Sequence, residues 1–79
     1  MASVLLFGPL RDLAGWRERD IDCPSLGALK TKLAAEDFDL GVALRQPGVQ
    51  VSVDQAIVRG DLALSSRAEV AFLPPMSGG

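Results

Sequence analysis

The 79-residue sequence contains no histidine, tyrosine or asparagine, and it has a single cysteine. Without histidine it lacks the most common general base and cannot form a serine–histidine–aspartate triad. One cysteine and no histidine cannot assemble a zinc site. No GxxxxGK[ST] or GxGxxG motif is present; the stretch Gly27-Ala28-Leu29-Lys30-Thr31 only mimics the end of the first motif. We therefore expect that another protein holds any ATP or metal that takes part in the function.

The sequence also lacks basic clusters and long hydrophobic runs. Its eight basic residues are scattered among ten acidic ones, for a net charge of −2, which argues against nucleic acid or an anionic membrane as a partner. The run Val4-Leu5-Leu6-Phe7 stops at Gly8-Pro9, too early for a signal peptide or a membrane span. Cys23 alone cannot form an internal disulfide, so a cytoplasmic location is expected. The remaining partners are proteins and small molecules.

Length and composition predict one small globular domain. The chain is 48% hydrophobic and 23% charged, close to ordinary globular usage. A chain of this size buries only about 60% of the surface that its unfolded form exposes. The core is therefore expected to be small, with little room for an enclosed active site.

The first half of the chain alternates between strand and helix patterns. Residues 3–7 (SVLLF) contain an unbroken apolar run from Val4 to Phe7, which predicts a central strand buried on both faces. Residues 10–13 suit one helical turn, and the alternation over residues 17–23 predicts an antiparallel edge strand. Ser25 is a good N-cap for a helix that carries one apolar stripe, made of Leu26, Leu29 and Leu33.

The second half adds a short helix over residues 38–44 and two strands, residues 49–53 and 56–58, joined by a turn at Asp54-Gln55. Ser66 and Glu69 have capping-box spacing, but the alternation that follows them favours a last strand. If the first and last strands are adjacent at the centre of the sheet, they run parallel. The order predicts an α+β, β-grasp (ubiquitin-like) roll with four to five strands and one main helix on one face, formed by residues 1–73.

The last six residues, PPMSGG, predict a slim projecting tail. Pro74 and Pro75 favour polyproline II geometry, and residues 74–79 reach at most about 20 Å. A terminal Gly-Gly arises by chance in roughly 1 chain in 200, but the stiff proline stem favours a functional interpretation. The free carboxylate of Gly79 suits covalent chemistry: adenylation by ATP makes its oxygen a leaving group, and a sulfur nucleophile then displaces AMP to leave a thiocarboxylate.

Three stretches, LFGPLRDLAG (6–15), VSVD (51–54) and EVAFLPPMSGG (69–79), together resemble the small subunit of molybdopterin synthase, the MoaD-type sulfur carriers. The resemblance implies that a ubiquitin-activating-like (MoeB-type) adenylyltransferase uses ATP to activate Gly79, which then becomes a thiocarboxylate. The tail then enters the MoaE-type large subunit and donates sulfur to cyclic pyranopterin monophosphate. Two small and two large subunits form the assembly, and the small subunit itself binds no cofactor or metal.

The resemblance also implies roles for other residues. Residues that thread the tail into the partner would be Gly78, Ser77, Met76, Pro75 and Pro74. Residues at the partner interface would be Phe7, Arg11, Phe72 and Leu73. The sequence departs from the family at Asp54, where asparagine is usual, at residues 65–69, which replace Gly-Asp-Glu, and at Leu73, which replaces a common second aromatic.

Other interpretations remain open at this stage. Apolar burial preference alone places Phe7 in the core. Cys23 is expected to be a small apolar residue rather than a persulfide site, since no neighbouring base in the sequence favours its thiolate. The alternative functions are a sulfur carrier for thiazole or cysteine biosynthesis, a ubiquitin-like protein modifier, and an interaction module with an inert tail.

Overall fold

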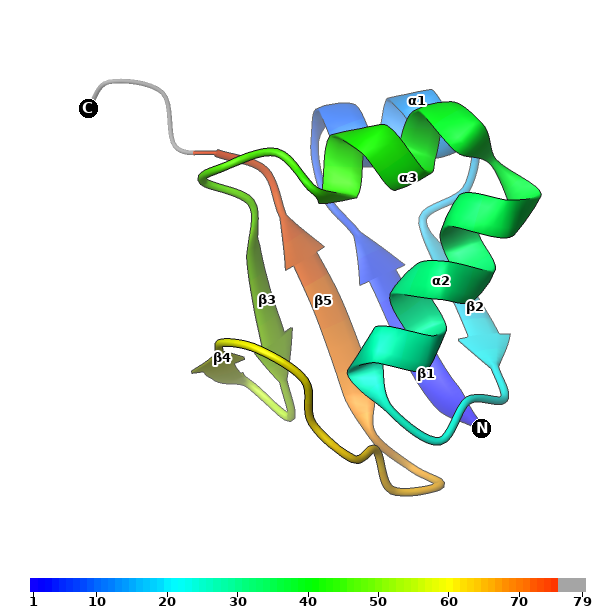
Figure 1. The fold of residues 1–79 in the computed structure, drawn as a ribbon, viewed down its shortest axis with the longest axis vertical. Helices are drawn as coiled ribbons and strands as arrows, with labels where there is room; N and C mark the ends of the chain where they lie inside the picture. The colour runs from blue at the N-terminus through cyan, green and yellow to red at the C-terminus, as the bar shows by residue number, and fades with distance from the viewer. Residues whose placement is uncertain (76–79) are drawn as a thin grey trace.

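A computed structural model describes residues 1–75 of the chain as a five-stranded mixed sheet with three helices. The strands are β1 (Ala2–Leu6), β2 (Glu18–Ile21), β3 (Gln50–Val53), β4 (Ala56–Val58) and β5 (Glu69–Leu73). Their order is β2-β1-β5-β3-β4 (Figure 1). The central pair, β1 and β5, is parallel, and the other pairs are antiparallel. The predicted β-grasp roll is confirmed, including the strand at 69–73.

The main helix, α2 (Leu26–Glu36), crosses the sheet (Figure 1) and begins after Ser25, as the sequence predicts. The Ser25 hydroxyl accepts a hydrogen bond from the Ala28 N–H at 3.1 Å. The predicted apolar stripe of α2 is buried: Leu26, Leu29 and Leu33 are each at most 1% exposed. Asp37 ends this helix and caps the next, because its carboxylate accepts from the Leu40 N–H at 3.1 Å.

The two shorter helices, α1 (Pro9–Ala14) and α3 (Phe38–Leu44), lie together at one end of the sheet (Figure 1). α3 has the predicted bounds. It packs very closely against α2, since a Cβ added to Gly41 would lie 2.5 Å from the Ala34 Cβ. No helix within residues 1–75 is both long and apolar enough to cross a bilayer.

The prediction that β1 is buried on both faces is wrong. Ala2, Val4 and Leu6 are buried, but Ser3 and Leu5 between them are only half-buried. The helices cover one face of the sheet and leave the other open. The apolar run of β1 thus correctly predicts that the strand is central in the sheet, but it does not predict whether both faces of the sheet are covered.

The Asp54-Gln55 turn accommodates the aspartate that replaces the asparagine usual in the family that the sequence resembles. Both residues have positive φ, 51° and 72°, as a type I′ hairpin turn requires. The Asp54 carboxylate accepts a hydrogen bond from the Glu69 N–H at 3.0 Å, and the Asp54 N–H donates to the Glu69 carbonyl at 2.8 Å. The turn thereby joins the β3–β4 hairpin to the start of β5.

Candidate functional site

The site is the point where the last strand leaves the sheet. β5 ends at Leu73, and Pro74 and Pro75 continue beyond it as a short stem. Pro74 is half-buried and Pro75 is exposed. The expectations for Met76, Ser77, Gly78 and Gly79 lie outside the described residues.

Two glycines from distant turns flank the stem. Gly8 precedes α1, and a Cβ added to it would lie 3.3 Å from Pro74 Cγ; a Cβ added to Gly48, in the α3–β3 turn, would lie 3.1 Å from Pro75 Cβ. Both glycines have positive φ, +56° and +93°, which L side chains rarely adopt. Backbone conformation and close approach thus both select glycine here. The dipeptides Gly8-Pro9 and Pro47-Gly48 are local turn signals in the sequence, and they do not predict that the two turns meet at the stem.

An apolar groove of about 500 Å³ opens beside the stem. One wall is the stem itself, and the others come from the start of α1, the end of α3 and the residues before β3. Six of its seven lining residues are apolar: Pro9, Leu10, Ala43, Val49, Pro74 and Pro75, with Gln46 as the polar member. The groove can accept an apolar side chain from a protein that holds the tail, but it offers no acid or base.

The open face of the sheet carries an apolar band that is interrupted by one polar residue, Ser52. The strand registers place Leu5, Ala71, Ser52 and Ile57 in one row across the four strands β1, β5, β3 and β4. Ile57 is 52% exposed and Leu5 is half-buried. Exposed apolar surface beside a functional end is typical of an interface.

Three of the four predicted interface residues lie at the surface. Phe7, next to Gly8, is 43% exposed, so the burial preference that placed it in the core is wrong here. Leu73 is half-buried at the base of the stem. Arg11 is exposed on α1, with its Nε 3.6 Å from an Asp12 carboxylate oxygen.

Phe72 departs from the expectation that it contacts a partner. Its side chain is 0% exposed and belongs to the core under the helices. The alternation of β5 explains the difference: Phe72 pairs with Leu6 and Val51, both on the helix-covered face. Leu73, one residue later, turns to the open face instead.

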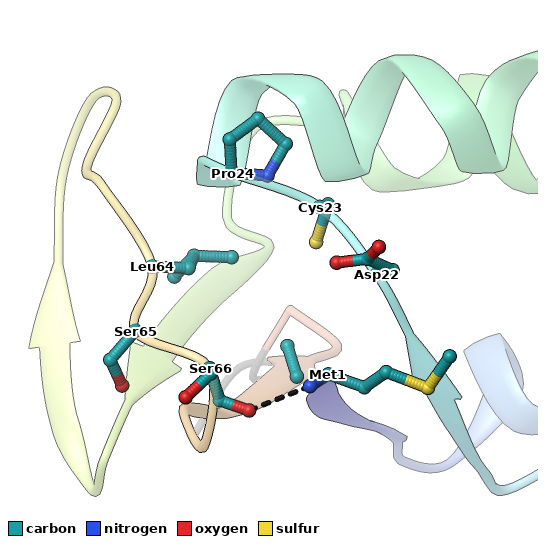
Figure 2. A pocket seen from close by; sticks show the side chains of 8 residues that line it. Met1, Asp22, Cys23, Pro24, Leu64, Ser65 and Ser66 are labelled. Atoms are coloured by element: carbon teal, nitrogen blue, oxygen red, sulfur yellow. Dashed lines mark hydrogen bonds between the residues drawn. The ribbon is translucent and has the colours of Figure 1, made fainter.

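Cys23 lies in a pocket of about 310 Å³ at the other end of β1, away from the stem (Figure 2). The N-terminal amine of Met1 borders this pocket and donates a hydrogen bond to the Ser66 carbonyl at 2.7 Å. Burial raises the pKa of the Cys23 thiol, with Lys32 opposing the shift. A raised pKa leaves less thiolate at neutral pH and makes the sulfur a poorer nucleophile. Cys23 therefore has the character of a structural residue.

Metal-ligating side chains do not gather in the described part of the chain. Among residues 1–75, no group of three histidine, cysteine, aspartate or glutamate side chains is placed to hold a metal ion. The chemistry that the described surface supports is recognition of a partner around the Pro74-Pro75 stem.

The ThiS family model matches residues 4–79 of the chain. The chain is 35% identical to the molybdopterin synthase sulfur carrier subunit of Escherichia coli (strain K12) and 28% identical to that of Haemophilus influenzae, over the full length of both proteins in each case. The solution structure of small archaeal modifier protein 1 (SAMP1) from Methanosarcina acetivorans is similar to it at a TM-score of 0.88 and 20% identity, covering 99% of this chain and 95% of that one. The crystal structure of SAMP1 from Haloferax volcanii is similar at a TM-score of 0.75 and 22% identity, covering 99% of this chain and 98% of that one. At these identities the two structures show a shared fold.

Proposed function

Because the chain belongs to the ThiS family and is a sulfur carrier of the MoaD type, we propose that it is the small subunit of molybdopterin synthase. The observation that carries the proposal is the 35% identity to a named sulfur carrier subunit over the full length of both chains. The proline stem between its two glycines and the apolar groove support it, because they fix the position of Pro74 and Pro75, from which the C-terminal residues continue.

The proposed chemistry takes place at the carboxylate of Gly79. A carboxylate oxygen attacks the α-phosphate of ATP, which forms an acyl-adenylate and releases pyrophosphate. Sulfur at the oxidation level of sulfide (HS−) then attacks the acyl carbon, AMP leaves and the S–H proton is lost to solvent, so that Gly79 carries a thiocarboxylate. This chain contributes the carried group and its position, and the partners contribute the ATP site and the acid–base residues.

We assign two protein partners to the tail. A MoeB-type adenylyltransferase binds ATP and activates Gly79, and a MoaE-type large subunit receives the thiocarboxylate and the cyclic pyranopterin monophosphate. Two small and two large subunits make the synthase. The apolar band on the open face, with Phe7 and Leu73 at its end, is the docking surface that we expect the partners to share.

The test is reconstitution from purified parts. The chain is made with a thiocarboxylate at Gly79 and mixed with the large subunit from the same organism and cyclic pyranopterin monophosphate, and molybdopterin is assayed. Product is expected from the thiocarboxylate form and not from the carboxylate form or from a chain that lacks Gly79. Folded, intact thiocarboxylate that gives no product would contradict this destination for the sulfur.

The same material separates the alternatives. A sulfur carrier for thiazole or cysteine biosynthesis would form the thiocarboxylate and fail with this acceptor. A ubiquitin-like modifier would join Gly79 to lysine side chains as an isopeptide and give higher-mass conjugates in cells, which would disappear when Gly79 is deleted. The SAMP1 structures share the fold on which either function can be built.

A further inference from the structure

Another cleft, of about 300 Å³, lies between α2, the α3–β3 turn and β4, and neither Pro74 nor Pro75 lines it. Two basic residues line it, Lys30 from α2 and Arg59 just after β4, and its lining contains no aspartate or glutamate. Gly48 lines the same cleft and also approaches Pro75. The cationic cleft and the base of the tail are therefore neighbours.

The two cations of this cleft are not neutralised within the described chain. Among residues 1–75, the ion pairs are Arg11–Asp12 and Arg19–Glu36, and neither Lys30 nor Arg59 forms one. The nearest acid in sequence, Asp61, uses one carboxylate oxygen to accept hydrogen bonds from the Gly27 and Leu62 N–H groups, both at 2.7 Å. Its pKa is lowered mainly by these two bonds, and only in small part by the charge of Lys30.

The positive charge of the cleft contrasts with the rest of the protein. Ten acidic residues stand against only six basic residues outside the cleft, on a chain of net charge −2. Lys30 is half-buried along the wall of the cleft, so less side-chain entropy remains to be lost when it binds a ligand. A local positive site on an acidic protein favours a ligand that carries carboxylates.

We propose that the Lys30–Arg59 cleft binds an acidic segment of the partner protein that receives the C-terminal tail. The inference rests on the proposed function, since it requires a protein partner at the stem. The remaining lining is largely apolar or backbone, with Val49, Ile57 and Val58 among it. This suits an aspartate or glutamate side chain flanked by apolar residues. Charge-assisted hydrogen bonds to both cations would fix the register of the partner and speed its approach.

The experiment compares two variants of equal charge change. Lys30→Glu/Arg59→Glu reverses both cations of the cleft, and Lys32→Glu/Arg67→Glu reverses two exposed cations outside its lining. Affinity and association rate are measured against the purified large subunit and the purified adenylyltransferase at low and high salt. For the large subunit, the partner that receives the tail, the cleft variant is expected to lose roughly 10-fold or more in affinity and most of its salt dependence, while the control stays within about 3-fold of wild type.

Circular dichroism checks that both variants fold, and Lys30→Gln/Arg59→Gln removes the charges without reversal should the glutamates unfold the chain. Equal affinity of the cleft and control variants for the large subunit would overturn the inference and leave sulfur transfer from Gly79 untouched. Saturable binding of inorganic phosphate at the cleft, in competition with the partners, would overturn it in favour of a small-anion site. A wild-type chain that binds neither partner would overturn both the inference and the proposed function.

Discussion

The two ends of the sheet are built by different means. At the far end, directed hydrogen bonds hold residues 62–64 to the start of α2: Leu26 donates to the Leu62 carbonyl at 2.8 Å, and Leu64 donates to the Pro24 carbonyl at 2.9 Å. The N-terminal amine adds the bond to Ser66. At the tail end, the stem is placed by the shapes of glycine and proline, next to an apolar groove.

Because its two ends are built differently, so small a domain can be both stable and available to partners. Polar bonds close the far end, where no projecting group must be offered. The tail end leaves apolar surface exposed, at Phe7 and in the groove, and positions the stem by van der Waals contact. Substitutions at the far end should therefore change stability, and those at the tail end should change function.

The largest effect should come from the core that joins the two ends. Phe72→Ala is expected to lower the free energy of unfolding by about 3–5 kcal/mol, because it removes a fully buried aromatic ring and leaves a cavity. Chemical denaturation measures this, with Phe72→Leu as the milder control. A Phe72→Ala chain of unchanged stability that fails to bind its partner would show that Phe72 acts at the partner interface and not in the core.

The next effect tests the tail end alone. Gly48→Ala and Gly15→Ala both place a side chain at positive φ, +93° and +83°, and each should cost about 1–2 kcal/mol. Only the Gly48 substitution crowds the stem, since a Cβ at Gly15 meets nothing within 4 Å. Sulfur transfer from the thiocarboxylate form should therefore fall roughly 10-fold for Gly48→Ala.

The control for this prediction is Gly15→Ala, which separates a loss of activity from a loss of stability. Gly15→Ala should lose comparable stability and keep the wild-type rate of molybdopterin formation in the same reconstitution. Equal rates for the two variants would show that the glycine beside Pro75 does not position the tail.

The fold could be predicted from the sequence because its signals are local. The Ser25 cap, the leucine stripe of α2 and the bounds of α3 depend on neighbouring residues and were confirmed. The prediction for β1 is wrong because the number of layers that cover a sheet is a tertiary property. An apolar residue such as Leu5 fits a strand whether one or both faces of the sheet are covered. Phe72 was misassigned for a related reason: its side in β5 follows from pairing with β1 and β3.

The site was predictable only where it is contiguous in sequence. The PPMSGG ending identified the tail, but the stem contacts join Gly8 to Pro74 across the whole chain. Lys30 on α2 and Arg59 after β4 line one cleft although they are far apart in sequence, and neither residue lies in a local pattern that predicts this. Tertiary structure supplies such juxtapositions, and no periodicity encodes them.

A smaller effect is expected at the far end, from Asp61. Asp61→Ala removes the acceptor for two backbone N–H groups and should lower the melting temperature by a few degrees with no change in partner binding. The pKa of Asp61 is lowered from its usual 3.8, so its contribution is complete above that value and is lost as the pH falls through the lowered pKa.

The matched control is Asp61→Asn, which keeps an acceptor oxygen and cannot titrate. Its thermal stability should decline less than that of wild type between pH 4 and the acid unfolding limit. Identical acid profiles for the two proteins would show that the bonds to Gly27 and Leu62 do not stabilise the folded chain through the charge of Asp61.

The smallest effect is expected for Cys23→Ser. The thiol lies at the far end, its pKa is raised by burial, and its Sγ donates to the Ile21 carbonyl at 3.8 Å, so it has neither the position nor the thiolate to relay sulfur to the tail. Molybdopterin formation should be unchanged when the whole sequence runs from ATP, adenylyltransferase and sulfur donor, the conditions in which a relay would show. Slow labelling of wild type by a disulfide reagent at pH 7 is the companion measurement. A folded Cys23→Ser chain that forms no thiocarboxylate would show that the far end takes part in the chemistry. The assignment of stability to the far end and of function to the tail end would then be wrong.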